Sequence, residues 1–295
     1  GKYRVKSTLQ LKEDLSKPQY KKKKWFIPVV EPVQFNPQGI NVHPYLMGCL
    51  LGDGYLGGGT MKITSADQEL VNHLSTILPI DNKIKQKSAI EYSFVSNSRV
   101  NNLTRYIKEY GLFKKTSGDK FIPDAYKFNT VENRIALLQG LLDTDGYCTK
   151  DGTIQFYTVS EQLCIDFKEL IRSLGGIVKQ TIKKGKYKKH DTIIACKDCY
   201  VLTVNLPQNI IPFKLSRKLN RIKKVKKYIP YRAISDISFS RYSDGQCIRV
   251  DAKDSLYVMG EYVVTHNTAQ SIVAALASGY KNILVVTLAS LKLNW

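Results

Sequence analysis

One nine-residue pattern occurs twice, as Leu46-Met47-Gly48-Cys49-Leu50-Leu51-Gly52-Asp53-Gly54 and as Leu138-Gln139-Gly140-Leu141-Leu142-Asp143-Thr144-Asp145-Gly146. Each copy is an apolar run typical of a buried helix, with glycine at its third position and Asp-Gly at its end. Because a glycine inside a helix costs about 1 kcal/mol relative to alanine, it indicates a place where another backbone comes close. The pattern predicts two helices that pack together and bring Asp53 and Asp145 side by side, as a site for a divalent metal.

The residues that follow each copy also match. Gly59-Thr60 comes after the first copy and Gly152-Thr153 after the second, and the aspartates Asp53 and Asp145 are 145 − 53 = 92 residues apart. A period of that length indicates a repeat on the scale of a domain rather than a solenoid unit. From periodicity and turn residues, each copy is predicted to form a helix, a β-hairpin and a second helix.

With these motifs, residues 40–226 resemble a LAGLIDADG homing endonuclease of the monomeric, two-repeat kind. The resemblance implies an α+β fold of two pseudo-symmetric αββαββα repeats, whose saddle-shaped antiparallel sheets lie in the DNA major groove. It also implies that Asp53 and Asp145 bind catalytic Mg²⁺, together with the main-chain carbonyls of Gly52 and Thr144. The alternative is that each aspartate merely ends a buried helix before glycine, and the matched second copy argues against it.

The charge balance predicts a polyanionic partner. The chain has 45 Lys+Arg against 25 Asp+Glu, a net charge of +20, which is the electrostatic footprint of a protein that binds nucleic acid. One basic stretch is predicted to be a hairpin with Gly185 at its turn, able to contact phosphates or base edges of double-stranded DNA. The candidate DNA-binding lysines in it are Lys179, Lys183, Lys184, Lys186, Lys188 and Lys189.

Two further lysines are candidate catalytic residues by resemblance. Lys120, in Lys120-Phe121-Ile122-Pro123, matches a block whose lysine assists cleavage in relatives, and Lys218 matches the lysine of a late basic block. Arg217 of that block is a predicted DNA contact. Taken singly, each lysine fits a solvated surface or a phosphate contact better than a catalytic role. The implied chemistry is metal-assisted phosphodiester hydrolysis, in which a lysine charge adds to transition-state stabilisation. Asp143 is the less suitable acid, because the first copy has Leu51 at that position.

A second chemistry is predicted near the C-terminus, where two β-rich segments end in Thr265-His266-Asn267-Thr268. An asparagine side chain can attack its own main-chain carbonyl and break the next peptide bond, with help from a neighbouring histidine, and a following threonine hydroxyl can accept an acyl group. The segment resembles the C-terminal splicing blocks of an intein, with Asn267 as the last intein residue and Thr268 as the first host residue. Cys247 and Thr265 match an intein subgroup in which an internal cysteine forms the branched thioester. Alternatively, Cys247 is a small buried strand residue.

The expected organisation follows from these resemblances. We expect the tail of an N-terminal splicing region and a connector over 1–37, and the endonuclease over 38–227 with repeats at about 42–127 and 133–226. The C-terminal splicing segment is expected over 228–267, and over 268–295 the start of a host protein that resembles a Swi/Snf-type helicase-like ATPase.

The expected context is a monomeric, cytoplasmic protein without a membrane span, with a nucleoid-associated or phage-encoded protein as the alternative setting. The chain begins at Gly1 and lacks an N-terminal splicing block, so it reads as a fragment whose N-terminal intein half is supplied in cis or by a split partner. Two other functions stay open: a LAGLIDADG protein that binds nucleic acid without cutting it, and a helicase-like ATPase fragment.

Overall fold

The computed structural model describes residues 6–18, 25–189, 192–195, 197–222, 231–241, 250–253 and 256–266. The chain divides into two compact units. One comprises Val30–Pro230, and the other combines Gly1–Val29 with Tyr231–Trp295. Within the described ranges, no helix has both the length and the apolar character needed to cross a membrane.

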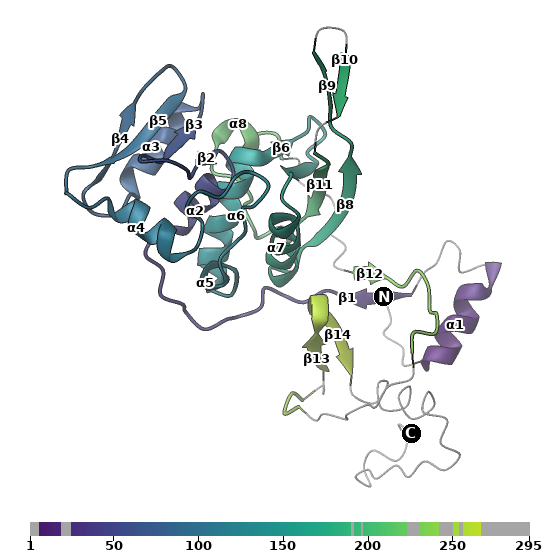
Figure 1. The fold of residues 1–295 in the computed structure, drawn as a ribbon. Helices are drawn as coiled ribbons and strands as arrows, with labels where there is room; N and C mark the ends of the chain where they lie inside the picture. Colours follow the sequence, from purple (N-terminus) through teal and green to yellow (C-terminus); the bar gives the residue numbers. More distant parts are fainter. Residues whose placement is uncertain are drawn as a thin grey trace. The chain divides into compact units, whose positions relative to one another are not determined.

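The unit Val30–Pro230 contains two halves with the same order of elements (Figure 1). Each half runs helix, two strands, helix, two strands, helix. The first half has one more short helix at its end, and the second half carries an added strand pair. The first half has α2 (Pro44–Leu51), β2 (Gly54–Tyr55), β3 (Lys62–Thr64), α3 (Gln68–Thr76), β4 (Asn82–Gln86), β5 (Glu91–Ser96), α4 (Asn102–Glu109) and α5 (Asp124–Lys127). The second has α6 (Val131–Asp145), β6 (Gly146–Cys148), β7 (Ile154–Thr158), α7 (Glu161–Ser173), β8 (Ile177–Lys183), β9 (Lys186–Lys189), β10 (Thr192–Ala195), β11 (Cys199–Asn205) and α8 (Ser216–Leu219).

Each half builds one four-stranded antiparallel sheet, with order β2-β3-β5-β4 in the first and β6-β7-β11-β8 in the second. Strand β7 shows the alternation that such a sheet requires: Ile154 and Phe156 are buried, whereas Gln155 and Tyr157 are partly exposed. The predicted mixed α and β chain with antiparallel sheets is confirmed.

The basic hairpin differs in one detail from the sequence prediction. Gly185 lies between β8 and β9, and the reversal occurs further along the chain, because β9 pairs with β10 and Lys189 stands opposite Thr192. Glycine marks a break in a strand, but the cross-strand register fixes where the chain turns back.

Helices α2 and α6 form the centre of the core of this unit, and every residue of α2 is buried. A Cβ built at Gly48 would lie 2.3 Å from the carbonyl oxygen of Leu137, and one built at Gly140 would lie 2.2 Å from that of Tyr45. Real Cβ atoms do not tolerate such distances, so the two glycines permit the helix backbones to touch. The close approach brings the two helix ends that carry the acidic residues to the same place.

The other unit joins segments from both ends of the described chain: α1 (Thr8–Ser16), β1 (Phe26–Pro28), β12 (Tyr231–Ala233), β13 (Leu256–Met259), a 3-10 helix (Gly260–Tyr262) and β14 (Val263–His266). Strand β1 pairs antiparallel with β12, β13 pairs with β14, and Val29 bridges to Val263. Helix α1 begins with a capping box at Ser7, and its buried Asp14 accepts a hydrogen bond from the indole of Trp25 at 3.2 Å. Residues far apart in sequence therefore share this unit.

Candidate active site

Asp53 and Asp145 lie at the ends of the two central helices. Asp53 follows Gly52, the residue that ends α2, and Asp145 is the last residue of α6. Burial, together with the negative charge of Asp53, raises the pKa of Asp145 to about 6. Burial also raises the pKa of Asp53, against the opposing charges of Lys120 and Lys218. The predicted pair therefore forms one electrostatic site.

Lys120 is buried, with 3% of its surface exposed. Its ammonium group donates to the carbonyl oxygens of Leu50, Gly52 and Gly54 at 3.0, 2.7 and 2.8 Å. Leu50 and Gly52 lie at the carboxyl end of α2, where a helix leaves its last acceptors without intrahelical partners and where the helix dipole favours a cation, and Gly54 begins β2. A solvated surface position is excluded for this lysine.

Lys218 makes the equivalent contacts in the second half. It is 4% exposed, and its ammonium group donates to the carbonyl oxygens of Leu142, Thr144 and Gly146 at 2.8, 3.3 and 2.6 Å. These three acceptors are the residues that correspond, at the 92-residue offset, to the acceptors of Lys120. It also donates to the carbonyl of Asp143 at 2.7 Å.

The electrostatics link both lysines to both acids. Burial lowers the pKa of Lys120 to about 8, while Asp145 and Asp53 raise it. Burial lowers the pKa of Lys218 to about 8 as well, with Asp143 and Asp53 among the groups that oppose it. The pKa of each lysine is therefore raised by an acid of the opposite half. The two lysines and the two aspartates form a single electrostatic site.

The carboxylate of Asp143 is engaged in hydrogen bonds within the protein. It is buried and accepts the hydroxyl of Tyr45 at 2.8 Å and the backbone N–H groups of Lys214 and Leu215 at 2.9 and 3.2 Å. The acceptor sites of Asp143 are therefore occupied by Tyr45 and by the segment before α8.

Within the described ranges, no cluster of three or more His, Cys, Asp or Glu side chains is arranged to hold a metal ion. A metal at this site would therefore rely on the two carboxylates Asp53 and Asp145 and on main-chain or non-protein oxygens. The carbonyls of Gly52 and Thr144, predicted as ligands, each accept a lysine hydrogen bond, but a carbonyl oxygen has two lone pairs.

The predicted DNA contacts occupy two places. Lys179, Lys183 and Lys184 are exposed on and after β8, and the Lys183 ammonium lies 5.5 Å from the ring centre of Tyr157. Lys186, Lys188 and Lys189 are residues of β9. Arg217 is instead engaged by Asp67, with its Nε and Nη2 donating to the carboxylate at 2.7 and 2.6 Å, a partner that sequence reasoning missed because 150 residues separate the two.

Of the predicted splicing residues, the structure describes only two. Thr265 is in β14 opposite Tyr257, and His266 ends β14 opposite Leu256. Cys247, Asn267 and Thr268 lie outside the described residues. The described residues therefore include the predicted acidic pair but not the predicted splicing junction.

Comparison with known proteins gives a family and several similar chains. The LAGLIDADG-like domain family matches residues 132–206. A replicative DNA helicase DnaB from Mycobacterium intracellulare is 29% identical over 234 residues, which cover 77% of this chain and 35% of that protein. The chain thus spans about a third of the length of this curated relative.

Two solved structures of the homing endonuclease I-DmoI also match. One belongs to a set of mesophilic variants (19% identity, TM-score 0.35), and the other is a complex with its target DNA in the presence of magnesium (18% identity, TM-score 0.36). Each match covers 56% of this chain and 89% of the solved one. The match to the LAGLIDADG-like domain family thus lies in the second half of the unit Val30–Pro230, from α6 to β11.

Proposed function

We propose that this chain is part of an intein whose central domain is a site-specific DNA endonuclease, which makes a Mg²⁺-dependent double-strand break at the allele that lacks the intein. The observation that carries the proposal is the matched pair Asp53 and Asp145, each at the end of a central helix and each accompanied by a buried lysine on equivalent carbonyls. The net charge of +20 supports DNA as the substrate.

The donor set fits magnesium. Mg²⁺ prefers oxygen ligands and is usually held by one or two carboxylates together with waters and substrate phosphates, so a site with two aspartates needs no third acidic residue. Burial and the repulsion by Asp53 raise the pKa of Asp145, and a bound cation would relieve that repulsion. When bound, magnesium would lower the pKa of a water molecule and neutralise charge on the phosphate.

The protein residues then have separate tasks. Asp53 and Asp145 hold negative charge at the helix ends, and both must be deprotonated to act as ligands. Lys120 and Lys218 fix the main-chain carbonyls around the acids and contribute positive charge close to where the phosphate would develop negative charge. The exposed lysines on and after β8, and the lysines in the sequence of β9, are proposed to contact DNA as phosphate or base-edge donors.

For the other unit we propose protein splicing. The side-chain nitrogen of Asn267 attacks its own main-chain carbonyl carbon, a succinimide forms, and the peptide bond to Thr268 breaks with its nitrogen leaving as the amine of Thr268. His266 assists by proton transfer. The thiol of Cys247 takes the acyl group of the peptide bond at the N-terminal junction to form the branched thioester, with the peptide nitrogen leaving as a free amine, and Thr265 completes the pattern of the same intein subgroup. The composition of this unit from both ends of the described chain supports an inserted endonuclease.

The replicative helicase relative supports a helicase as the host protein. From the sequence resemblance alone, residues 268–295 are proposed as the start of a Swi/Snf-type helicase-like ATPase. We further propose a cytoplasmic monomer that acts with an N-terminal intein half, in cis or as a split partner.

The test of homing uses two DNA substrates that differ only in the insertion: the uninterrupted host gene around the junction, and the same gene with the intein sequence in place. With Mg²⁺, the first should be cut in both strands and the second left intact. Equal cutting of both, or of neither, would reject homing.

The splicing proposal has its own test, in the protein completed with its N-terminal half. There, Asn267→Ala should prevent release at the Thr268 junction. Release at the wild-type rate would show that the junction lies elsewhere.

A further inference from the structure

Helix α8 carries Lys218 but spans only four residues, Ser216–Leu219. A single helical turn has no stability of its own, because nucleation fixes several residues for one hydrogen bond. Its position must therefore come from contacts outside itself. Asp143 supplies one such contact by accepting the N–H groups of Lys214 and Leu215.

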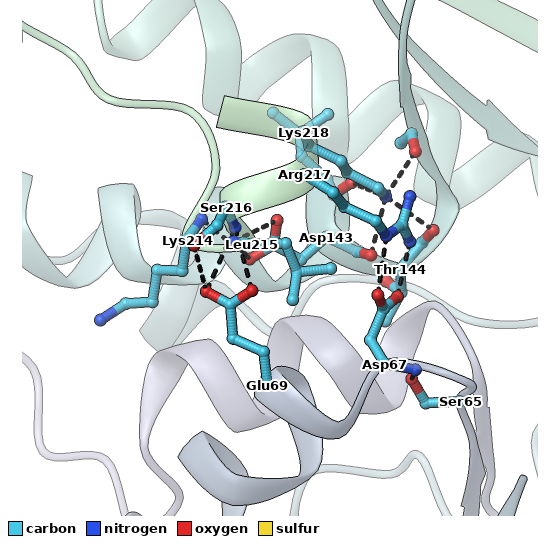
Figure 2. Close-up of polar contacts among 12 residues, drawn as sticks. Ser65, Asp67, Glu69, Asp143, Thr144, Lys214, Leu215, Ser216, Arg217 and Lys218 are labelled. Carbon is cyan, nitrogen blue, oxygen red and sulfur yellow. Dashed lines mark hydrogen bonds and ion pairs between the residues drawn. The ribbon is translucent and has the colours of Figure 1, made fainter. Parts of the chain in front are cut away.

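Two acids of the opposite half supply further contacts (Figure 2). Glu69, in the first turn of α3, accepts the backbone N–H of Ser216 with both carboxylate oxygens at 3.1 Å and its hydroxyl at 2.7 Å. Asp67, directly before α3, makes the two-pronged pair with Arg217. Paired N–H···O bonds of this kind fix orientation as well as distance, so Asp67 and Glu69 orient the turn that presents Lys218.

The segment of Lys120 is held in the corresponding way by the second half. Ser160, directly before α7, donates its hydroxyl to the carbonyl of Lys120 at 2.6 Å, and Asp166 of α7 accepts the N–H of Ile122 at 2.8 Å. Each lysine-bearing segment is thus attached to the helix that follows the first strand pair of the other half. The two attachments differ in burial: Ser160 and Asp166 are buried, whereas Glu69 and Arg217 are exposed.

We propose that Asp67 and Glu69 are positioning residues, which hold Lys218 at the second half of the active site from across the interface between the repeats. This inference rests on the proposed endonuclease function. Without the two acids, α8 loses its attachment to α3, and Lys218 leaves the carbonyls around Asp145, while Lys120 keeps its own buried attachment. The two halves of the site then differ in activity, and one DNA strand is cut more slowly than the other.

A supercoiled plasmid carrying one target site resolves the two cuts. One exposed ion pair contributes little by itself, so Asp67→Asn and Glu69→Gln are combined. The double variant should accumulate nicked circle, with the second cut at least about tenfold slower, while its affinity for target DNA in Ca²⁺ stays within about threefold of wild type; tenfold in rate corresponds to about 1.4 kcal/mol of barrier.

One control is Glu109→Gln, which removes an exposed carboxylate of α4 far from α8 in sequence. The other control is Asp67→Glu with Glu69 intact, which keeps the charge and should keep most of the second cut. Loss of both cuts in equal measure, or of neither, overturns the positioning role.

A second readout does not need DNA cleavage. Modification of lysines by an amine-reactive reagent, followed by mass spectrometry, should label Lys218 several-fold faster in the double variant, with Lys120 of the same sample unchanged. Unchanged labelling of Lys218, or faster labelling of both lysines, contradicts the inference. If the wild-type protein cuts no DNA, the proposed function fails, and the labelling ratio still decides the role of Asp67 and Glu69.

Discussion

Gly48 and Gly140 face each other across the two central helices, and a Cβ built at Gly140 would lie 3.0 Å from the Cα of Gly48. The helices are therefore as close as their backbones allow. This contact sets the separation of the helix ends, where Asp53 and Asp145 lie, so it links packing in the core directly to the geometry of the acidic site.

A methyl group at either glycine should push the helices apart. For Gly48→Ala and Gly140→Ala we expect the free energy of unfolding to fall by about 1–3 kcal/mol or more, as for other overpacked cores, measured by chemical denaturation. Gly39→Ala is the control, because nothing lies within 4 Å of a Cβ at that position. Wild-type stability of both core variants would show that the helices do not touch in this way.

The buried lysines should matter for stability as well as for chemistry. Lys120→Met or Lys218→Met keeps the apolar stem but leaves several buried carbonyls without a donor, and each unpaired buried group costs about 1–3 kcal/mol. We expect a clear drop in the denaturation midpoint for both variants, with the exposed Lys85→Met unchanged. A more stable methionine variant would contradict the hydrogen bonding seen here.

Cleavage should depend on pH on both sides of neutrality. Asp145 has its pKa raised to about 6, so acid below that value protonates a ligand and slows the reaction. Lys120 and Lys218 have pKa values lowered to about 8, so their positive charge is lost above it. A bell-shaped profile of cleavage rate against pH, with limbs at about pH 6 and pH 8, is expected in single-turnover assays. Its acid limb should move to lower pH as the Mg²⁺ concentration rises, because the metal and the proton compete for the same carboxylate. An acid limb that ignores the Mg²⁺ concentration would contradict the assignment.

Acid should also destabilise the domain through the start of α2. The ring of His43 accepts the N–H of Tyr45 through Nδ1, and burial followed by the charges of His73 and Lys214 lowers the pKa of His43 below the ordinary 6.5. The unfolded chain then binds more protons between the two pKa values, so this stability is complete above pH 6.5 and is lost as pH falls through that region. His43→Asn keeps a capping acceptor without titrating, and should flatten the curve of unfolding free energy against pH. An unchanged slope would exclude His43 as its source.

Local sequence patterns were sufficient for the residues that repeat. Gly48 and Gly140 could be paired from the internal repeat, and the 92-residue offset that relates Asp53 to Asp145 also relates the carbonyls that receive the two lysines. The attachment of α8 could not be predicted in this way, because Asp67 and Arg217 are 150 residues apart and no periodicity connects an exposed acid with a distant arginine. The turn expected at Gly185 was misplaced because β8 pairs with the more distant β11 while β9 pairs with β10, so Gly185 lies between two strand pairings and not at the turn of a hairpin.

The most direct measurement is Mg²⁺-dependent cleavage of the target DNA by wild type, Asp53→Asn and Asp145→Asn, with binding to the same DNA followed in parallel. If the two carboxylates hold the metal together, each single variant should keep its DNA affinity and lose about 10²–10³-fold in rate, the effect of several kcal/mol of lost stabilisation. Cleavage near the wild-type rate by either variant, or cleavage that does not require a divalent metal, would contradict a shared site.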